Sequence, residues 1–193
     1  MDIIAHGLWA GAGAILAQRY NPIPRGTVLA IVAMAVLPDI PHLIPVVGWS
    51  LFGDGSAAAI RAYAMAVAGN APAAPPDIDS WSHNLHCVMH SAVIAGLVTL
   101  LSWWRLRYLW LPLLGWWSHI VIDVFTHAVD YFPSPVLYPF TRKGFDGLAW
   151  TNPWFMVGNY TALVLVYGWL AWHRRTTLLA MKRSDRCTES GKD

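Results

Sequence analysis

One strongly apolar stretch carries three side chains that can bind a metal ion: His119, Asp123 and His127, each four residues from the next. On a helix, a step of four residues advances the angle by about 40° and the rise by about 6 Å, so the three side chains form one stripe about 12 Å long. That length is too great for three ligands of one ion, since a zinc–nitrogen bond is about 2 Å. The spacing suits Asp123 as a carboxylate that bridges two ions, with a histidine serving each. A buried His–Asp hydrogen-bonded pair beside an unrelated histidine is the alternative.

The composition predicts a membrane protein of one domain. Of the 193 residues, 56% are hydrophobic and only 12% are charged, whereas soluble domains average about 25% charged residues. Several apolar runs are long enough to cross a bilayer. The formal net charge is only +2, so we expect no nucleic-acid partner. The two cysteines lie in very different surroundings, and we expect no disulfide between them.

The apolar runs predict an all-α, multi-pass helical bundle with about five spans. The runs cover residues 3–19, a second segment that begins at 27, about 83–104, 108–127 and about 155–172. Pro38 and Pro41 should break the second span, and broken backbone at membrane depth is tolerated where it lines a cavity. Residues 1–175 are predicted to form the membrane-embedded domain, and 176–193 a polar, disordered cytoplasmic tail.

Basic residues predict the orientation of the bundle. Of the 13 Lys and Arg residues, all but Arg61, Arg142 and Lys143 fall on one side of the five-span arrangement. Cytoplasmic loops carry the excess of Lys and Arg. We therefore expect a bacterial-type inner (plasma) membrane protein with its N-terminus outside and its C-terminus in the cytoplasm.

Four separate segments should deliver metal-binding side chains to one layer of the outer leaflet. Counting about 1.5 Å per residue from each inner basic end places these side chains about 18–30 Å above it. The inner halves of the segments are nearly free of ionisable groups, which favours a pocket open to the outside over a conduit. The predicted metal ligands are His6, Asp39, His86, His90, His119, Asp123 and His127.

Other polar residues of the layer have less definite roles. His86 and His90 are four residues apart on one helix face, a common spacing for two ligands of one ion. For His42, the sequence favours neither a metal ligand nor a residue outside the site. His83 at the rim is expected to be solvated. Arg142 and Lys143 are loop charges that are candidates for binding a substrate anion.

Short motifs resemble the membrane-bound metal-dependent hydrolases of the YdjM/YbcI type. They span about residues 1–150, and they are Met1-Asp2-Ile3-Ile4-Ala5-His6, Leu37-Pro38-Asp39-Ile40, His90-Ser91, Ser118-His119 with Asp123 and Thr126, and Tyr138-Pro139-Phe140-Thr141-Arg142-Lys143. The resemblance implies a multi-pass membrane protein and a divalent-metal hydrolase. Two positions depart from the family pattern: Pro41 replaces a second carboxylate, and a histidine expected at 85 stands at 86.

The resemblance and the residues together favour a hydrolase with two or three zinc ions facing outward. Asp123 would bridge two ions, and Asp39 would bind metal or act as the catalytic base. The His-xxx-Asp-xxx-His spacing is also similar to the zinc-dependent phospholipase C and P1-nuclease class, which hydrolyses phosphoesters. We therefore expect the substrate to be a phosphoester of a lipid or lipid-linked molecule. A non-catalytic metal-binding or transport protein and a di-iron lipid hydroxylase or desaturase are the alternatives, and the oligomeric state is open.

Overall fold

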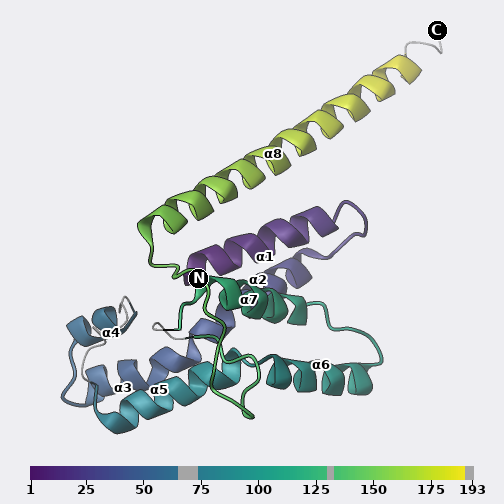
Figure 1. Ribbon diagram of the computed structural model, residues 1–193. Coiled ribbons are helices and arrows are strands. Elements are labelled where there is room, and N and C mark those ends of the chain that lie inside the picture. Colours follow the sequence, from purple (N-terminus) through teal and green to yellow (C-terminus); the bar gives the residue numbers. More distant parts are fainter. Residues whose placement is uncertain (65–73, 130–132, 190–193) are drawn as a thin grey trace.

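The computed structural model of the chain describes residues 1–64, 74–129 and 133–189 (Figure 1). The described residues form helices joined by turns and loops, without a β-strand among them, so the all-α prediction is confirmed for this part of the chain. The elements are α1 (Ile3–Ala17), α2 (Arg25–Val36), the short 3-10 turns η1 (Leu37–Asp39) and η2 (Pro41–Leu43), α3 (Ile44–Phe52), α4 (Ala57–Ala64), α5 (Pro76–Met89), α6 (Ala92–Leu106), α7 (Leu113–Thr126) and α8 (Pro153–Glu189).

Two described stretches of helix are long and apolar enough to cross a membrane. They are Arg25–Phe52, which runs from α2 to α3, and Pro153–Thr176 in α8. Helices α5 and α6 make a third candidate when they are counted as one span bent by 53°. With 15 and 14 residues, α1 and α7 are only about 22 and 21 Å long, less than the roughly 30 Å of a bilayer core. The structure thus supports a helical membrane protein with two or three candidate spans, and about five spans stay a prediction.

The first candidate span changes from α-helix to tighter turns at its prolines. Helix α2 gives way to η1 and η2 before α3 begins, and Pro38 and Pro41 lie within these turns. Proline cannot donate the backbone hydrogen bond that continues an α-helix. The turns carry Asp39 and His42 in the middle of an apolar segment, and Asp39 is only 8% exposed.

Helices α1, α2 and α7 lie against one another near the centre of the molecule (Figure 1). Small side chains such as Ala10, Ala14 and Ala35 fill the contact between α1 and α2. At the crossing of α2 and α7, a Cβ atom on Gly115 would lie 2.0 Å from the carbonyl oxygen of Ile31. Only glycine allows this approach, which brings the two backbones close enough for side chains of α7 to reach carbonyl groups of α2.

A serine stabilises the bend between α5 and α6 with two hydrogen bonds. The Ser91 hydroxyl accepts a hydrogen bond from the Ile94 backbone N–H at 3.1 Å and donates one to the Tyr138 carbonyl at 2.6 Å. A serine in this position is a favourable start for a helix. His90 lies between the two helices and is therefore held off the regular helical path.

Further hydrogen bonds join the remaining segments to the centre. The loop after α7 returns to its end, where the Gly147 N–H donates to the His127 carbonyl at 2.8 Å. Helix α8 is joined to the start of the chain by the Tyr160 hydroxyl, which donates to Asp2 Oδ1 at 2.9 Å. Helix α8 continues to Glu189, into the range predicted as a disordered tail, and residues 190–193 lie outside the described residues.

Candidate metal centre

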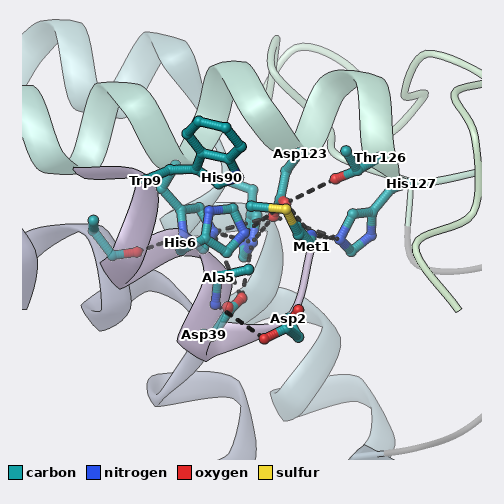
Figure 2. Close-up of polar contacts among 12 residues, drawn as sticks. Met1, Asp2, Ala5, His6, Trp9, Asp39, His90, Asp123, Thr126 and His127 are labelled. Atoms are coloured by element: carbon teal, nitrogen blue, oxygen red, sulfur yellow. Dashed lines mark hydrogen bonds and ion pairs between the residues drawn. The ribbon is translucent and has the colours of Figure 1, made fainter. Parts of the chain in front are cut away.

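The seven side chains predicted as metal ligands are all buried at the centre of the molecule. They are His6 on α1, Asp39 on η1, His86 on α5, His90 between α5 and α6, His119 and Asp123 on α7, and His127 directly after α7. Figure 2 shows that His6, Asp39, His90, Asp123 and His127 point toward one another from these different elements. The fold therefore gathers the predicted ligands in one place.

Four of these side chains, called the inner group below, are Asp39, His90, His119 and Asp123, and their ligand atoms all lie within 4.8 Å of one another. Asp123 Oδ2 is 3.1 Å from Nε2 of both histidines, whose Nε2 atoms are 3.0 Å apart. Asp39 Oδ1 is 3.5 Å from each Nε2. Ligand atoms at about 2.0–2.2 Å from a tetrahedral ion are separated by about 3.3–3.6 Å. The inner group can hold one ion with only small adjustments.

Backbone carbonyls orient both imidazoles of the inner group. His119 Nδ1 lies 2.7 Å from the Ala35 carbonyl oxygen, and His90 Nδ1 lies 2.9 Å from that of His86. A carbonyl oxygen only accepts, so each Nδ1 carries the proton and each Nε2 presents a lone pair to the group. Partners of this kind fix the tautomer and the ring orientation of metal-binding histidines.

The two carboxylate oxygens of Asp123 face different partners (Figure 2). Oδ2 faces His90 and His119, whereas Oδ1 lies 2.8 Å from His6 Nε2 and contacts the Met1 amino group. The same amino nitrogen lies 3.1 Å from His127 Nε2. A carboxylate with its oxygens divided in this way can bridge two cations.

Comparisons with protein-family models, with curated proteins and with solved structures found no match to this chain. The chemistry of the donor atoms indicates what the centre can bind. Imidazole nitrogens and carboxylate oxygens suit zinc and also manganese and iron, whereas softer sites use cysteine sulfur. Cys87 points to His83 on α5, with Sγ 3.5 Å from Nε2, and is not part of the inner group.

A cavity of about 430 Å³ opens beside the inner group and is lined in part by its Asp39. His42, His86 and His127 also line it. The ring centroids of His42 and His86 are 5.6 Å apart, and those of His86 and His127 are 6.2 Å apart. The sequence alone did not decide whether His42 is a metal ligand. The structure places His42 in the lining of the cavity and not in the inner group.

Arg142 and Lys143 are not among the described residues that line the cavity. The Arg142 guanidinium donates to Asn84 Oδ1 on α5 at 2.8 Å and lies over the Tyr138 ring at 5.8 Å. On a helix, Asn84 is about 200° away from His86, which lines the cavity. The structure therefore brings Arg142 to α5 but not to the predicted ligands.

Several cavity-lining residues were not predicted from the sequence as site residues, and Asp2, Tyr63 and Trp150 are the ones with a carboxylate or an aromatic ring. Asp2 directly precedes an apolar run, a pattern typical of a helix cap, and its Oδ1 accepts from the Ala5 N–H at 3.0 Å. Tyr63 belongs to the apolar face of a short helix, a pattern that indicates packing but not a site. The sequence contains no signal that would bring Trp150 to the cavity.

Proposed function

We propose that the protein is a membrane-embedded, divalent-metal-dependent hydrolase that acts on a phosphoester of a lipid or lipid-linked substrate. The observation that carries the proposal is the inner group, in which two carboxylates and two imidazoles from three segments of the chain have ligand atoms within 4.8 Å of one another. Buried groups of this kind are costly in an apolar bundle unless they bind something. A metal ion would satisfy all four at once.

Zinc is the proposed metal, and two ions are the proposed number. The separations in the inner group, 3.0–3.5 Å for the pairs with His90 and His119, support a small tetrahedral ion. The second ion would use Asp123 Oδ1, since that oxygen faces His6 and not the inner group. His127 is a further ligand on that side, because its Nε2 lies 3.1 Å from the Met1 amino nitrogen that contacts Oδ1.

Asp39 is the residue proposed to move the proton. Its Oδ1 belongs to the inner group, whereas its Oδ2 is buried and has no hydrogen-bond partner among the described residues. When bound, the metal supplies Lewis-acid chemistry and makes water a better nucleophile at neutral pH. As water attacks phosphorus, Asp39 Oδ2 would take its proton and then pass it to the leaving alcohol oxygen, so that one P–O bond forms as another breaks.

A lipid substrate is supported by where the centre lies. Asp39 and His90 of the centre belong to Arg25–Phe52 and to the bent pair of α5 and α6, which are candidate membrane spans, and apolar side chains such as Ile3 and Leu43 line the adjacent cavity. With the proposed outward orientation, the substrate would come from the outer leaflet of the plasma membrane. The phosphate would be bound by the metal, since Arg142 contacts Asn84 and does not line the cavity.

Metal analysis of the purified protein together with a lipid assay tests the proposal. Zinc-loaded protein incubated with membrane lipid extract should release phosphate or phosphorylated headgroup. Asp123→Asn should lose both metal and turnover, with a metal dissociation constant raised more than about tenfold, because it removes charge shared by the ligands. His83→Ala is the matched control, since His83 contacts Cys87 and lies outside the inner group.

Several results would contradict the proposal. Iron in place of zinc would favour the hydroxylase or desaturase alternative. Release of free fatty acid alone would identify an acyl ester as the target. Equal metal content in Asp123→Asn and His83→Ala would make Asp123 a structural partner of His119, and metal without turnover of any lipid would favour a non-catalytic metal-binding protein.

A further inference from the structure

The lining of the cavity beside the inner group combines buried polar side chains with more exposed apolar ones. Three polar lining residues, called the floor below, are Asp39, His86 and His127, and each is at most 8% exposed. Two apolar lining residues, called the mouth below, are Ile4, which is 67% exposed, and the half-buried Leu43. Between these two sets, polarity increases from the surface inward.

The surface around the mouth is also apolar. Ile40 and Ile44 flank the turn η2 that carries Leu43, and they are 43% and 61% exposed. Two aromatic residues, Tyr63 and Trp150, also line the cavity. The described lining residues include neither Lys nor Arg, and the Met1 amino group is buried against Asp123, so Ile4 and Leu43 have no exposed basic group beside them in the lining.

This order of polarity fits one kind of ligand. A soluble polar molecule would have to shed its hydration at the mouth without new partners there, which is costly. An amphiphile that enters with its headgroup first would place polar atoms at the floor and apolar atoms at the mouth. Burying its first methylene groups against the mouth is favourable, at about 0.8 kcal/mol for each CH₂.

We propose that the cavity binds the headgroup end of a membrane lipid, with the headgroup at the floor and the first part of the apolar chain against Ile4 and Leu43. The cavity volume of about 430 Å³ is at the low end of the 300–1,000 Å³ that is typical of small-molecule sites. It accepts the headgroup end, and the rest of the chains stay in the bilayer. This inference rests on the proposed function for the chemistry of the headgroup, and it adds which residues select the apolar part.

Photo-crosslinking with a lipid that cannot be hydrolysed tests this binding mode without using activity. The probe is an ether lipid with a phosphonate in place of the phosphoester and a diazirine on the chain next to the glycerol. The full-length protein in lipid nanodiscs is irradiated with the probe, with and without zinc, and the adducts are mapped by mass spectrometry. We expect adducts to concentrate at residues 3, 4 and 43 in both conditions, since the apolar contacts do not need the metal.

Two variants on the same helix provide the comparison. Ile4→Gln should lower the adduct yield at the mouth about fivefold, because a polar group replaces an apolar contact. Ile15→Gln, which changes an isoleucine with 38% exposure near the other end of α1, should leave the yield within about twofold. Leu43→Gln should reproduce the effect of Ile4→Gln from a different element.

The outcomes separate this inference from the proposed hydrolase. If adducts concentrate at the mouth but the protein turns over no lipid, the lipid-binding mode is supported and the proposed hydrolase activity is contradicted. Turnover of lipid with adducts spread evenly over the apolar surface, including residue 15, would overturn the binding mode and leave the hydrolase. Full competition by a chain-free glycerol phosphonate at the concentration of the probe would also overturn the binding mode, because the chain would then contribute nothing.

Discussion

At the scale of single residues, the centre depends on which atom of each side chain faces inward. His119 and His90 each use Nδ1 on a backbone carbonyl, so that Nε2 is left for the inner group. Asp123 uses its two oxygens in two directions, toward the inner group and toward His6. The ring of His6 stacks on that of His119, with centroids 3.8 Å apart. Each imidazole is held by a neighbour before any ion binds, which favours a rigid site.

His6 allows a test of the proposed number of ions. His6→Gln should lower the zinc content by about one ion per chain and leave the ion of the inner group, since His6 Nε2 faces Oδ1 of Asp123 and not Oδ2. Elemental analysis after dialysis would measure this difference. His83→Gln is the control, because His83 is hydrogen-bonded to Cys87 and lies outside the inner group. An unchanged zinc content would indicate a single-ion centre, and loss of all zinc would show that His6 supports the whole centre.

The membership of the centre could be predicted from the sequence, but the arrangement of its members could not. His86 and His90 are spaced as two ligands of one ion. In the structure, α5 ends at Met89, and the rings of His86 and His90 stack with centroids 3.9 Å apart. His90 therefore turns into the inner group while His86 faces the cavity. The cause is the start of a new helix at Ser91, whose hydroxyl donates to the Tyr138 carbonyl. The spacing of His86 and His90 gives no information about this contact, because Tyr138 lies 47 residues after Ser91.

At the scale of elements, the centre depends on a helix crossing that only glycine permits. Gly115 places α7 directly against the backbone of α2. The same approach lets His119 Nδ1 donate to the Ala35 carbonyl one helical turn further along. The close approach of these two helices and the orientation of one proposed ligand thus have the same cause. A sequence pattern reveals a small residue here but does not reveal which backbone it meets.

Gly115→Ala should therefore weaken both folding and metal binding. The added Cβ would lie 2.0 Å from the Ile31 carbonyl oxygen, so the helices must separate at a cost of about 1–3 kcal/mol, or roughly 3–10 °C in Tm. Gly168→Ala in α8 is the matched control, because a Cβ there meets nothing within 4 Å. Thermal unfolding and zinc titration would measure both effects. Equal stability and zinc affinity in the two variants would contradict the role given to this crossing.

At the scale of the whole molecule, the elements were easier to predict than the spans. The apolar runs predicted helices because every one of them exceeds the length of a strand, and the prolines predicted the break before α3. The count of about five spans treated each run as long enough to cross the bilayer. Helices α1 and α7 start or end at the centre, with His6 and Thr126 near those ends, and they are shorter than the candidate spans. Hydropathy alone therefore does not tell a full span from a shorter helix that ends at a buried site.

The direction from which the proposed substrate would enter depends on the orientation of the bundle. In Figure 1, the turn between α1 and α2, the end of α6 and the far end of α8 all lie toward the same side of the molecule. These are the segments that carry Arg19, Arg105 and Arg174. By the positive-inside rule, we expect that side to be cytoplasmic. Helices α3, α4 and α5 lie on the other side of the centre (Figure 1), which would place the cavity toward the outside.

Cysteine labelling in intact cells tests this orientation. In a background without Cys87 and Cys187, Asp54→Cys in the segment before α4 should react with a membrane-impermeant maleimide. Asp54 is exposed, whereas a side chain at Gly55 would lie 2.8 Å from the Ser50 backbone. Ser184→Cys should react only after the membrane is permeabilised, because the basic end of α8 would be cytoplasmic. The reverse pattern would place the cavity in the cytoplasm, so that the lipid would have to enter from the inner leaflet and the metal would come from the cytoplasmic pool. Labelling of both positions in intact cells would show instead that an even number of spans separates them, and the prediction of about five spans would be wrong.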